Sequence, residues 1–254
     1  MQPMRNGVTI LAYHRFGGST PVSVDLPLAQ AEDQLDWIAG TADTISLDEA
    51  ATRLMRPASA PRARPQVVLT ADDGTADWVE VLLPLLVARR LPMTWYVATK
   101  FVDEREGFPY EGSPISWAAL REAVSTGLVT IGSHTHSHAV MTRLDAASAA
   151  AELDRSIGRI EEELDRPCRH FAYPKALAPS DEADREVRKR FTTAALAGNR
   201  VNVPGRSDPA RLGRTPIKRS DGAGRFMSKL NGGGRIEGWL REQYDTLRHH
   251  DAVT

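Results

Sequence analysis

The sequence has 254 residues, with 32 basic and 33 acidic side chains and a formal net charge of −1. Nothing in this balance indicates a polybasic tail or patch that would bind nucleic acid or an anionic membrane surface, so neither is expected as a partner. The single cysteine, Cys168, excludes an internal disulfide bond. No apolar run reaches the ~20 residues of a membrane span, and residues 1–13 lack an apolar segment long enough for a signal peptide. We therefore expect a cytoplasmic protein.

Strand-like and helix-like segments alternate along the chain. Buried strands are predicted at residues 8–13, from 67 onward, at 93–99, before 134, and at 170–174, 192–197 and 212–218. Helices are predicted at residues 28–39, 46–55, from 77 onward, 116–127, 153–164, 180–190 and 236–247, with a polar loop at 100–114. The alternation favours parallel βα units in one domain over residues 1–254. About seven strands favour a barrel whose site lies at the carboxyl ends of the strands.

Two adjacent carboxylates, Asp72 and Asp73, follow the apolar run that begins at Val67, and Gly74 follows them. A sheet interior does not accommodate two unpaired carboxylates, because burying an unpaired charge is very costly. We therefore place both at the carboxyl end of the strand, where α/β folds bind their ligands. A plain Asp-Gly turn is the alternative interpretation.

Three histidines, at positions 134, 136 and 138, follow a second apolar run. His134 and His138 are four residues apart, so one helical turn would place both rings on the same side. With one of the aspartates they would offer two nitrogen ligands and one oxygen ligand. Three protein ligands leave a coordination position open for water or substrate, which is typical of a catalytic metal site.

These stretches resemble the motifs of the polysaccharide deacetylases, carbohydrate esterase family 4. The Thr-Phe-Asp-Asp-Gly motif of that family corresponds to residues 70–74, and its His-Ser/Thr-x-x-His motif corresponds to residues 134–138. Its Phe-Ala-Tyr-Pro-Tyr/Phe-Gly motif corresponds to residues 171–176. Four further blocks resemble a bacterial branch that includes poly-N-acetylglucosamine deacetylases: residues 11–14, 44–47, 115–117 and 214–217. The resemblance covers nearly the whole chain and implies an α/β fold, a distorted (β/α)7 barrel in a single domain.

The resemblance also implies a metal and a substrate. One divalent ion is expected, most often Zn²⁺, with Co²⁺, Ni²⁺ or Mn²⁺ as alternatives. Its implied ligands are Asp73, His134 and His138. The implied partner is an acetylated sugar or polysaccharide, and the implied reaction is metal-dependent hydrolysis of its acetyl groups.

Catalytic roles follow from the same resemblance. It implies that Asp72 is the general base and that His14, in the N-terminal Tyr-His pair, is the general acid. It further implies that the backbone N–H of Lys175 helps to bind the oxyanion. The residues expected to contact the sugar are Tyr173, Pro174 and Trp117.

The third motif departs from the family pattern, because Lys175 and Ala176 replace an aromatic residue and a glycine. A cationic Lys175 would favour an anionic substrate, such as a uronate or a phosphorylated sugar, whereas a solvated surface lysine is the alternative. Two other functions remain open. One is an O-acetyl esterase or another C–N amide hydrolase on the same fold, and the other is a catalytically degenerate carbohydrate-binding protein.

Overall fold

The computed structural model describes residues 6–57, 62–110 and 112–233. At its centre is a ring of parallel strands, in which β1 pairs with β5 on one side and with β10 on the other. The strands of the ring are β1 (Val8–Tyr13), β5 (Gln66–Asp73), β6 (Met93–Val97), β7 (Val129–Ser133), β8 (His170–Ala172), β9 (Thr193–Ala197) and β10 (Leu212–Pro216). The ring is a closed, distorted (β/α)7 barrel, which confirms the predicted fold class.

The strands are buried along almost their whole length. Every residue of β1 and β6 is buried, and in β5 only the last residue, Asp73, is partly exposed. Strands buried on both faces are typical of parallel sheets that helices cover. β1 and β5 pair over six residues, whereas β7 and β8 pair only through Ser133 and Phe171. The ring is therefore joined most extensively at β1–β5 and least at β7–β8.

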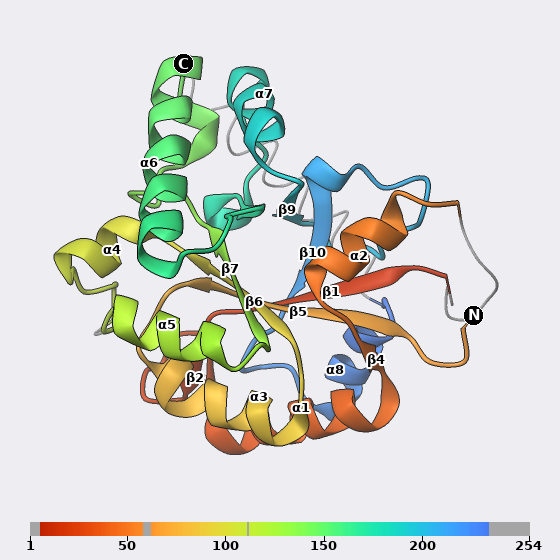
Figure 1. Cartoon of the computed structure of the whole chain (residues 1–254). Coiled ribbons are helices and arrows are strands. Elements are labelled where there is room, and N and C mark those ends of the chain that lie inside the picture. Colours follow the sequence, from red (N-terminus) through yellow and green to blue (C-terminus); the bar gives the residue numbers. More distant parts are fainter. Residues whose placement is uncertain (1–5, 58–61, 111, 234–254) are drawn as a thin grey trace.

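Helices surround the barrel, and Figure 1 shows α1, α3 and α5 along one side of the strands with α6 and α7 on the opposite side. α1 packs against α3 and α8, and α6 packs against α5 and α7. The α-helices are α1 (Leu28–Thr41), α2 (Leu47–Leu54), α3 (Leu83–Arg89), α4 (Thr99–Glu104), α5 (Trp117–Ser125), α6 (Ala146–Leu164), α7 (Asp181–Arg190) and α8 (Ala223–Leu230).

Serine caps fix the starts of three helices where the sequence predicts them. The hydroxyls of Ser46, Ser116 and Ser180 each accept a hydrogen bond from the backbone N–H three residues later. Such a cap satisfies one of the N–H groups that a helix start leaves without a partner. The predicted helices that begin at these serines are therefore confirmed.

The segment after Gly74 differs from its prediction. Asp77 does not cap the next helix, because its carboxylate accepts the backbone N–H of Phe16 at 2.5 Å. The chain instead forms a π-helical turn, η1 (Trp78–Leu82), and then α3, in which Pro84 occupies the first turn. Proline has no N–H to donate, so the first turn is the position in an α-helix that tolerates it.

The predicted loop at residues 100–114 is wrong at its start, because α4 occupies Thr99–Glu104. Four short elements were not predicted: β2 (Arg15–Gly17), β3 (Asp25–Pro27), β4 (Asp43–Thr44) and α8. The predicted helix at 236–247 lies outside the described residues. Within the described ranges, no helix has the length and apolar character needed to cross a membrane.

Candidate metal centre and catalytic cavity

A cavity of about 370 Å³ opens at the carboxyl ends of the barrel strands. It is lined by Ala12 of β1 and by His14 directly after it, by Asp72 and Asp73 of β5, and by His134 and His138 of the β7–α6 segment. The segments after β8 and β10 contribute Lys175, Ala176 and Lys218, and β10 itself contributes Arg214 and Pro216. The cavity therefore contains six of the nine residues to which the sequence analysis assigns a role.

Asp73, His134 and His138 come together on one side of this cavity. Asp73 Oδ1 lies 3.6 Å from His134 Nε2 and 3.4 Å from His138 Nε2. One ligand atom from each of the three lies within 4.8 Å of the others, which matches the spacing of ligands around one metal ion. His134 is 2% exposed, whereas Asp73 and His138 are 27% and 26% exposed, so the cluster faces the cavity on one side.

The surroundings of His134 leave the lone pair of its Nε2 available to bind a cation. Its Nδ1 lies 2.7 Å from the carbonyl oxygen of Ala172, an acceptor, so Nδ1 carries the proton and Nε2 presents a lone pair. Burial lowers the pKa of His134 to about 4, which keeps the ring neutral near pH 7. A neutral imidazole with Nε2 facing a carboxylate is the form that binds metal ions. This donor set fits a divalent transition-metal ion.

The two histidines meet through a loop and not through the helical turn that the spacing suggests. Residues 134–140 form no helix, and both Thr135 and His138 have positive φ, at 64° and 60°. Glu152 on α6 holds this loop, because its carboxylate accepts the backbone N–H groups of His136 and Ser137 at 3.0 and 2.8 Å. The Ser137 hydroxyl donates to the same carboxylate at 2.8 Å. Left-handed backbone at non-glycine residues stores strain that is common at functional sites.

Asp72 is buried beside the cluster and is paired with Arg214 of β10. The guanidinium donates from Nη1 and Nη2 to the two carboxylate oxygens at 2.6 and 2.7 Å. Burial alone would raise the pKa of Asp72, but the charge and hydrogen bonds of Arg214 hold that pKa below its ordinary value. Asp72 is therefore ionised at neutral pH. A carboxylate has about four acceptor positions, so two remain after Arg214 has bound.

His14 reaches the same cavity from the end of β1, although it is 58 residues before Asp72 in the chain. The indole N–H of Trp78 donates to the His14 carbonyl at 2.5 Å, which anchors the backbone. His14 Nδ1 is buried and has no hydrogen-bond partner among the described residues. A buried polar atom without a partner is costly, so the unpaired His14 Nδ1 is an exception to the usual pairing of buried polar groups.

Lys175 follows β8 in a short 3₁₀ turn, η3 (Pro174–Ala176), with φ and ψ of 56° and 9°. This left-handed conformation is not that of a regular helix. The backbone N–H of Lys175 donates no hydrogen bond within the described residues. The side chain is exposed at the cavity. The residue therefore offers both a free N–H and a cation there.

Tyr173, Pro174 and Trp117 are not part of the cavity wall formed by the described residues. Tyr173 is fully buried, and its hydroxyl donates to Asp184 on α7 at 3.1 Å. The Trp117 indole donates to Asp103 at 2.8 Å, and the Arg159 guanidinium lies 5.5 Å from its ring centre. The side chains of Tyr173 and Trp117 thus have partners away from the cavity, and the sugar contacts expected for all three remain predictions.

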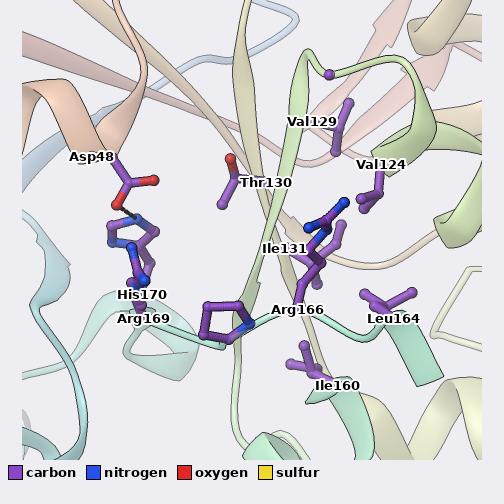
Figure 2. A pocket seen from close by; sticks show the side chains of 12 residues that line it. Asp48, Val124, Val129, Thr130, Ile131, Ile160, Leu164, Arg166, Arg169 and His170 are labelled. Atoms are coloured by element: carbon purple, nitrogen blue, oxygen red, sulfur yellow. Dashed lines mark ion pairs between the residues drawn. The ribbon is translucent and has the colours of Figure 1, made fainter. Parts of the chain in front are cut away.

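Two further histidines, His136 and His170, have separate surroundings. His136 Nδ1 lies 2.8 Å from the Thr99 hydroxyl. His170 is fully buried at the amino-terminal end of β8, with Nε2 3.2 Å from Asp48 and Nδ1 2.9 Å from Thr193. Figure 2 shows the His170–Asp48 pair beside a second pocket of about 300 Å³, in which Arg166 lies among aliphatic side chains such as Ile131 and Leu164.

Arg214 and Glu152 are the two site residues that the sequence analysis did not assign. Arg214 lies in one of the resembling blocks, at residues 214–217, and a basic residue on a strand otherwise buried is the signal that could have found it. Glu152 carries no such signal, because it is one of many acidic residues on a long amphipathic helix.

Comparison with known proteins decides the family. The family model described as polysaccharide deacetylase matches residues 59–193, which is more than half of the chain. The chain belongs to the polysaccharide deacetylase family. The match includes Asp72, Asp73, His134 and His138, whereas His14 and Arg214 lie outside it. Membership supports an enzyme that acts on acetylated carbohydrate. No curated protein matches the chain.

Solved structures of deacetylases share the fold. Streptococcus pyogenes deacetylase PplD, determined with acetate, has a TM-score of 0.78 at 17% identity, over 90% of this chain and 99% of that chain. IcaB from Ammonifex degensii has a TM-score of 0.72 at 22% identity, over 89% and 96% of the two chains. A de-N-acetylase from Aggregatibacter actinomycetemcomitans has a TM-score of 0.70 at 20% identity, over 87% and 99%. At these identities the likeness concerns the barrel alone.

Proposed function

We propose that this deacetylase removes the acetyl group from an N-acetylated sugar or polysaccharide by metal-assisted hydrolysis. The observation that carries the proposal is the cluster of Asp73, His134 and His138, whose ligand atoms lie within 4.8 Å of one another in the wall of the cavity. The ionised Asp72 adjoins the same cavity, so a metal site and a base lie together.

Two imidazole nitrogens and one carboxylate oxygen favour Zn²⁺, and Co²⁺, Ni²⁺ and Mn²⁺ are alternatives. A divalent ion held there would polarise the acetyl oxygen and lower the pKa of a water molecule toward ~7. Asp73 and His138 are partly exposed, so the open side of the site faces the cavity and admits a substrate.

Asp72 would take the proton of the attacking water. Its pairing with Arg214 keeps it ionised and fixes its orientation, because a bidentate guanidinium holds a carboxylate in one plane. Both side chains are almost completely buried, which prevents bulk water from competing for the pair. A base that is oriented in advance needs no rearrangement when the reaction begins.

His14 would protonate the departing amine, because an amine is expelled from a tetrahedral intermediate only when it receives a proton. Its side chain lines the same cavity, and histidine is the side chain that most often serves as an acid or base in catalysis. The backbone N–H of Lys175 would stabilise the oxyanion on the acetyl carbon, since a preorganised N–H without another partner suits that task.

The proposal is tested by measuring acetate released from a panel of N-acetylglucosamine oligomers and O-acetylated sugars by the zinc-loaded full chain. We expect release from the N-acetylated oligomers. Release from the O-acetylated sugars alone would replace the proposal with an O-acetyl esterase. Tight sugar binding without any release, in a chain that contains zinc, would replace it with a carbohydrate-binding protein.

A further inference from the structure

The lysines of this chain divide into two groups. The sequence contains five lysines, and three of them form ion pairs with carboxylates. Those three are Lys100, Lys189 and Lys229. The other two, Lys175 and Lys218, form no ion pair within the part of the chain that the structure describes, and both line the catalytic cavity. The unpaired lysines therefore gather at the place where substrate would bind.

The turn that carries Lys218 is held in place from several sides. The Lys218 N–H donates to Asp221 Oδ2 at 2.8 Å, and the Arg219 N–H donates to the Ser23 carbonyl at 2.7 Å. Asp221 is buried, and the same oxygen receives Lys229 Nζ at 2.6 Å. The nearby carboxylate is thus engaged by another lysine, while Lys218 stays at the cavity on an ordered turn.

The fixed charges of the cavity wall are unbalanced. It contains the carboxylates of Asp72 and Asp73 and the cations Arg214, Lys175 and Lys218. Arg214 and Asp72 neutralise each other. Asp73 is one of the proposed metal ligands, and a bound divalent ion would add two positive charges. Lys175 and Lys218 remain without compensation. A cavity whose wall carries a net positive charge attracts an anionic ligand.

We propose that Lys175 and Lys218 select an N-acetylated sugar that carries an anionic group, a carboxylate or a phosphate, close to the acetylated residue. The inference rests on the proposed function and adds the charge of its substrate. The two lysines belong to different segments, one after β8 and one after β10, and both line the same cavity. A lysine meets a carboxylate or a phosphate as a point charge, so the two anions share this recognition.

The test compares three oligosaccharides with the zinc-loaded full chain: a neutral N-acetylglucosamine trimer, the same trimer phosphorylated, and a hyaluronan tetrasaccharide that contains glucuronate. The measured quantity is the ratio of kcat/KM for each anionic substrate to kcat/KM for the neutral one. We expect ratios above one for at least one anion, and the two arms distinguish phosphate from carboxylate. Added salt should reduce the ratio, because it screens exposed charges.

Three variants make the comparison specific. Lys218→Gln should lower the ratio about tenfold. The double variant, which carries both Lys175→Gln and Lys218→Gln, should lower the ratio further. Lys189→Gln is the matched control, because it removes a lysine that pairs with Glu186 on the surface of α7, and it should leave the ratio unchanged. Damage to catalysis in general would reduce all rates together and leave the ratio as it was.

Calorimetric titration of the chelator-treated full chain with the same oligosaccharides gives a readout that does not require turnover. Tighter binding of an anionic sugar, lost in Lys218→Gln, would support the inference even if acetate release failed and contradicted the proposed function. Equal binding and equal kcat/KM for neutral and anionic sugars would overturn the inference while leaving deacetylation intact. A ratio that the double variant does not change would also overturn it.

Discussion

The Arg214 guanidinium binds both oxygens of the Asp72 carboxylate, at 2.6 and 2.7 Å, inside the barrel. The two residues are 142 positions apart, on β10 and β5, and β1 lies between these strands in the ring. The guanidinium carbon also lies 5.3 Å from the ring centre of Tyr96 on β6. The arginine thus connects opposite sides of the barrel wall and sets the charge and orientation of the proposed base.

Removing the arginine should affect stability and catalysis together. Arg214→Ala leaves the buried Asp72 without its partner, and loss of one member of a buried ion pair costs about 3–5 kcal/mol of unfolding free energy. Urea denaturation measures this cost. Arg89→Ala is the control, because its partner Asp36 is exposed, and it should change stability little. Equal effects of the two substitutions would contradict the importance of the buried pair.

A conservative change separates the two roles of Arg214. Arg214→Lys keeps the charge but loses the planar fork that holds both carboxylate oxygens. We expect kcat for acetate release to fall at least about tenfold while zinc content stays normal, because orientation of Asp72 is lost and the metal ligands are not. Wild-type kcat in Arg214→Lys would show that orientation by the guanidinium is not needed.

Metal binding should depend on His138 and not on His136. His138→Ala removes one of the three proposed ligands, so we expect most of the bound zinc to be lost while the barrel stays folded. His136→Ala is the neighbouring control, since that ring pairs with Thr99 and not with the cluster. Elemental analysis measures the zinc, and circular dichroism verifies the fold. A His138→Ala protein with full zinc content would disprove the ligand assignment.

Glu152 should influence the metal although it is not a ligand. Its carboxylate accepts two backbone N–H groups of the loop that carries His138. Glu152→Ala should therefore weaken zinc affinity about 10–100-fold, the usual cost of losing support around a metal ligand. Glu162→Ala on the same helix, with an exposed side chain, serves as control. Competition with a zinc chelator gives both affinities, and equal values would leave the loop contact without a role.

His14 should matter most when the leaving group is poor. His14→Ala should slow amide deacetylation by ~10²–10⁴-fold, the usual contribution of a general acid. Hydrolysis of an activated aryl acetate should fall much less, because a phenolate leaves without a proton. Zinc content should not change. Equal losses on the amide and the activated ester, or an empty metal site, would remove the acid role from His14.

The sequence predicts most of the fold because the barrel strands are apolar runs and three helices start at serine caps. α4 escaped prediction, since it has only six residues and no side-chain cap at its start. The π-helical turn after Asp77 also escaped, because the choice between capping and binding Phe16 depends on a strand 61 residues earlier in the chain. Short elements set by distant contacts leave no local pattern.

The site could be predicted only where its residues adjoin one another in sequence. Asp72 and Asp73 are neighbours, and His134 and His138 share one short loop, so their grouping is visible before folding. The resemblance supplied His14. The pairing of Arg214 with Asp72 and of Glu152 with the loop depends on the closed barrel and on the position of α6, so neither could be derived from local patterns.

One titration tests the central claim most directly, that Asp73, His134 and His138 hold the metal ion on which deacetylation depends. The chelator-treated full chain is titrated with zinc while acetate release from an N-acetylglucosamine oligomer is followed. We expect release to rise linearly up to one equivalent of zinc per chain and then to stay constant, because the described residues form one such cluster. Undiminished release without any metal would contradict the account, and so would one bound zinc with no release from any acetylated sugar.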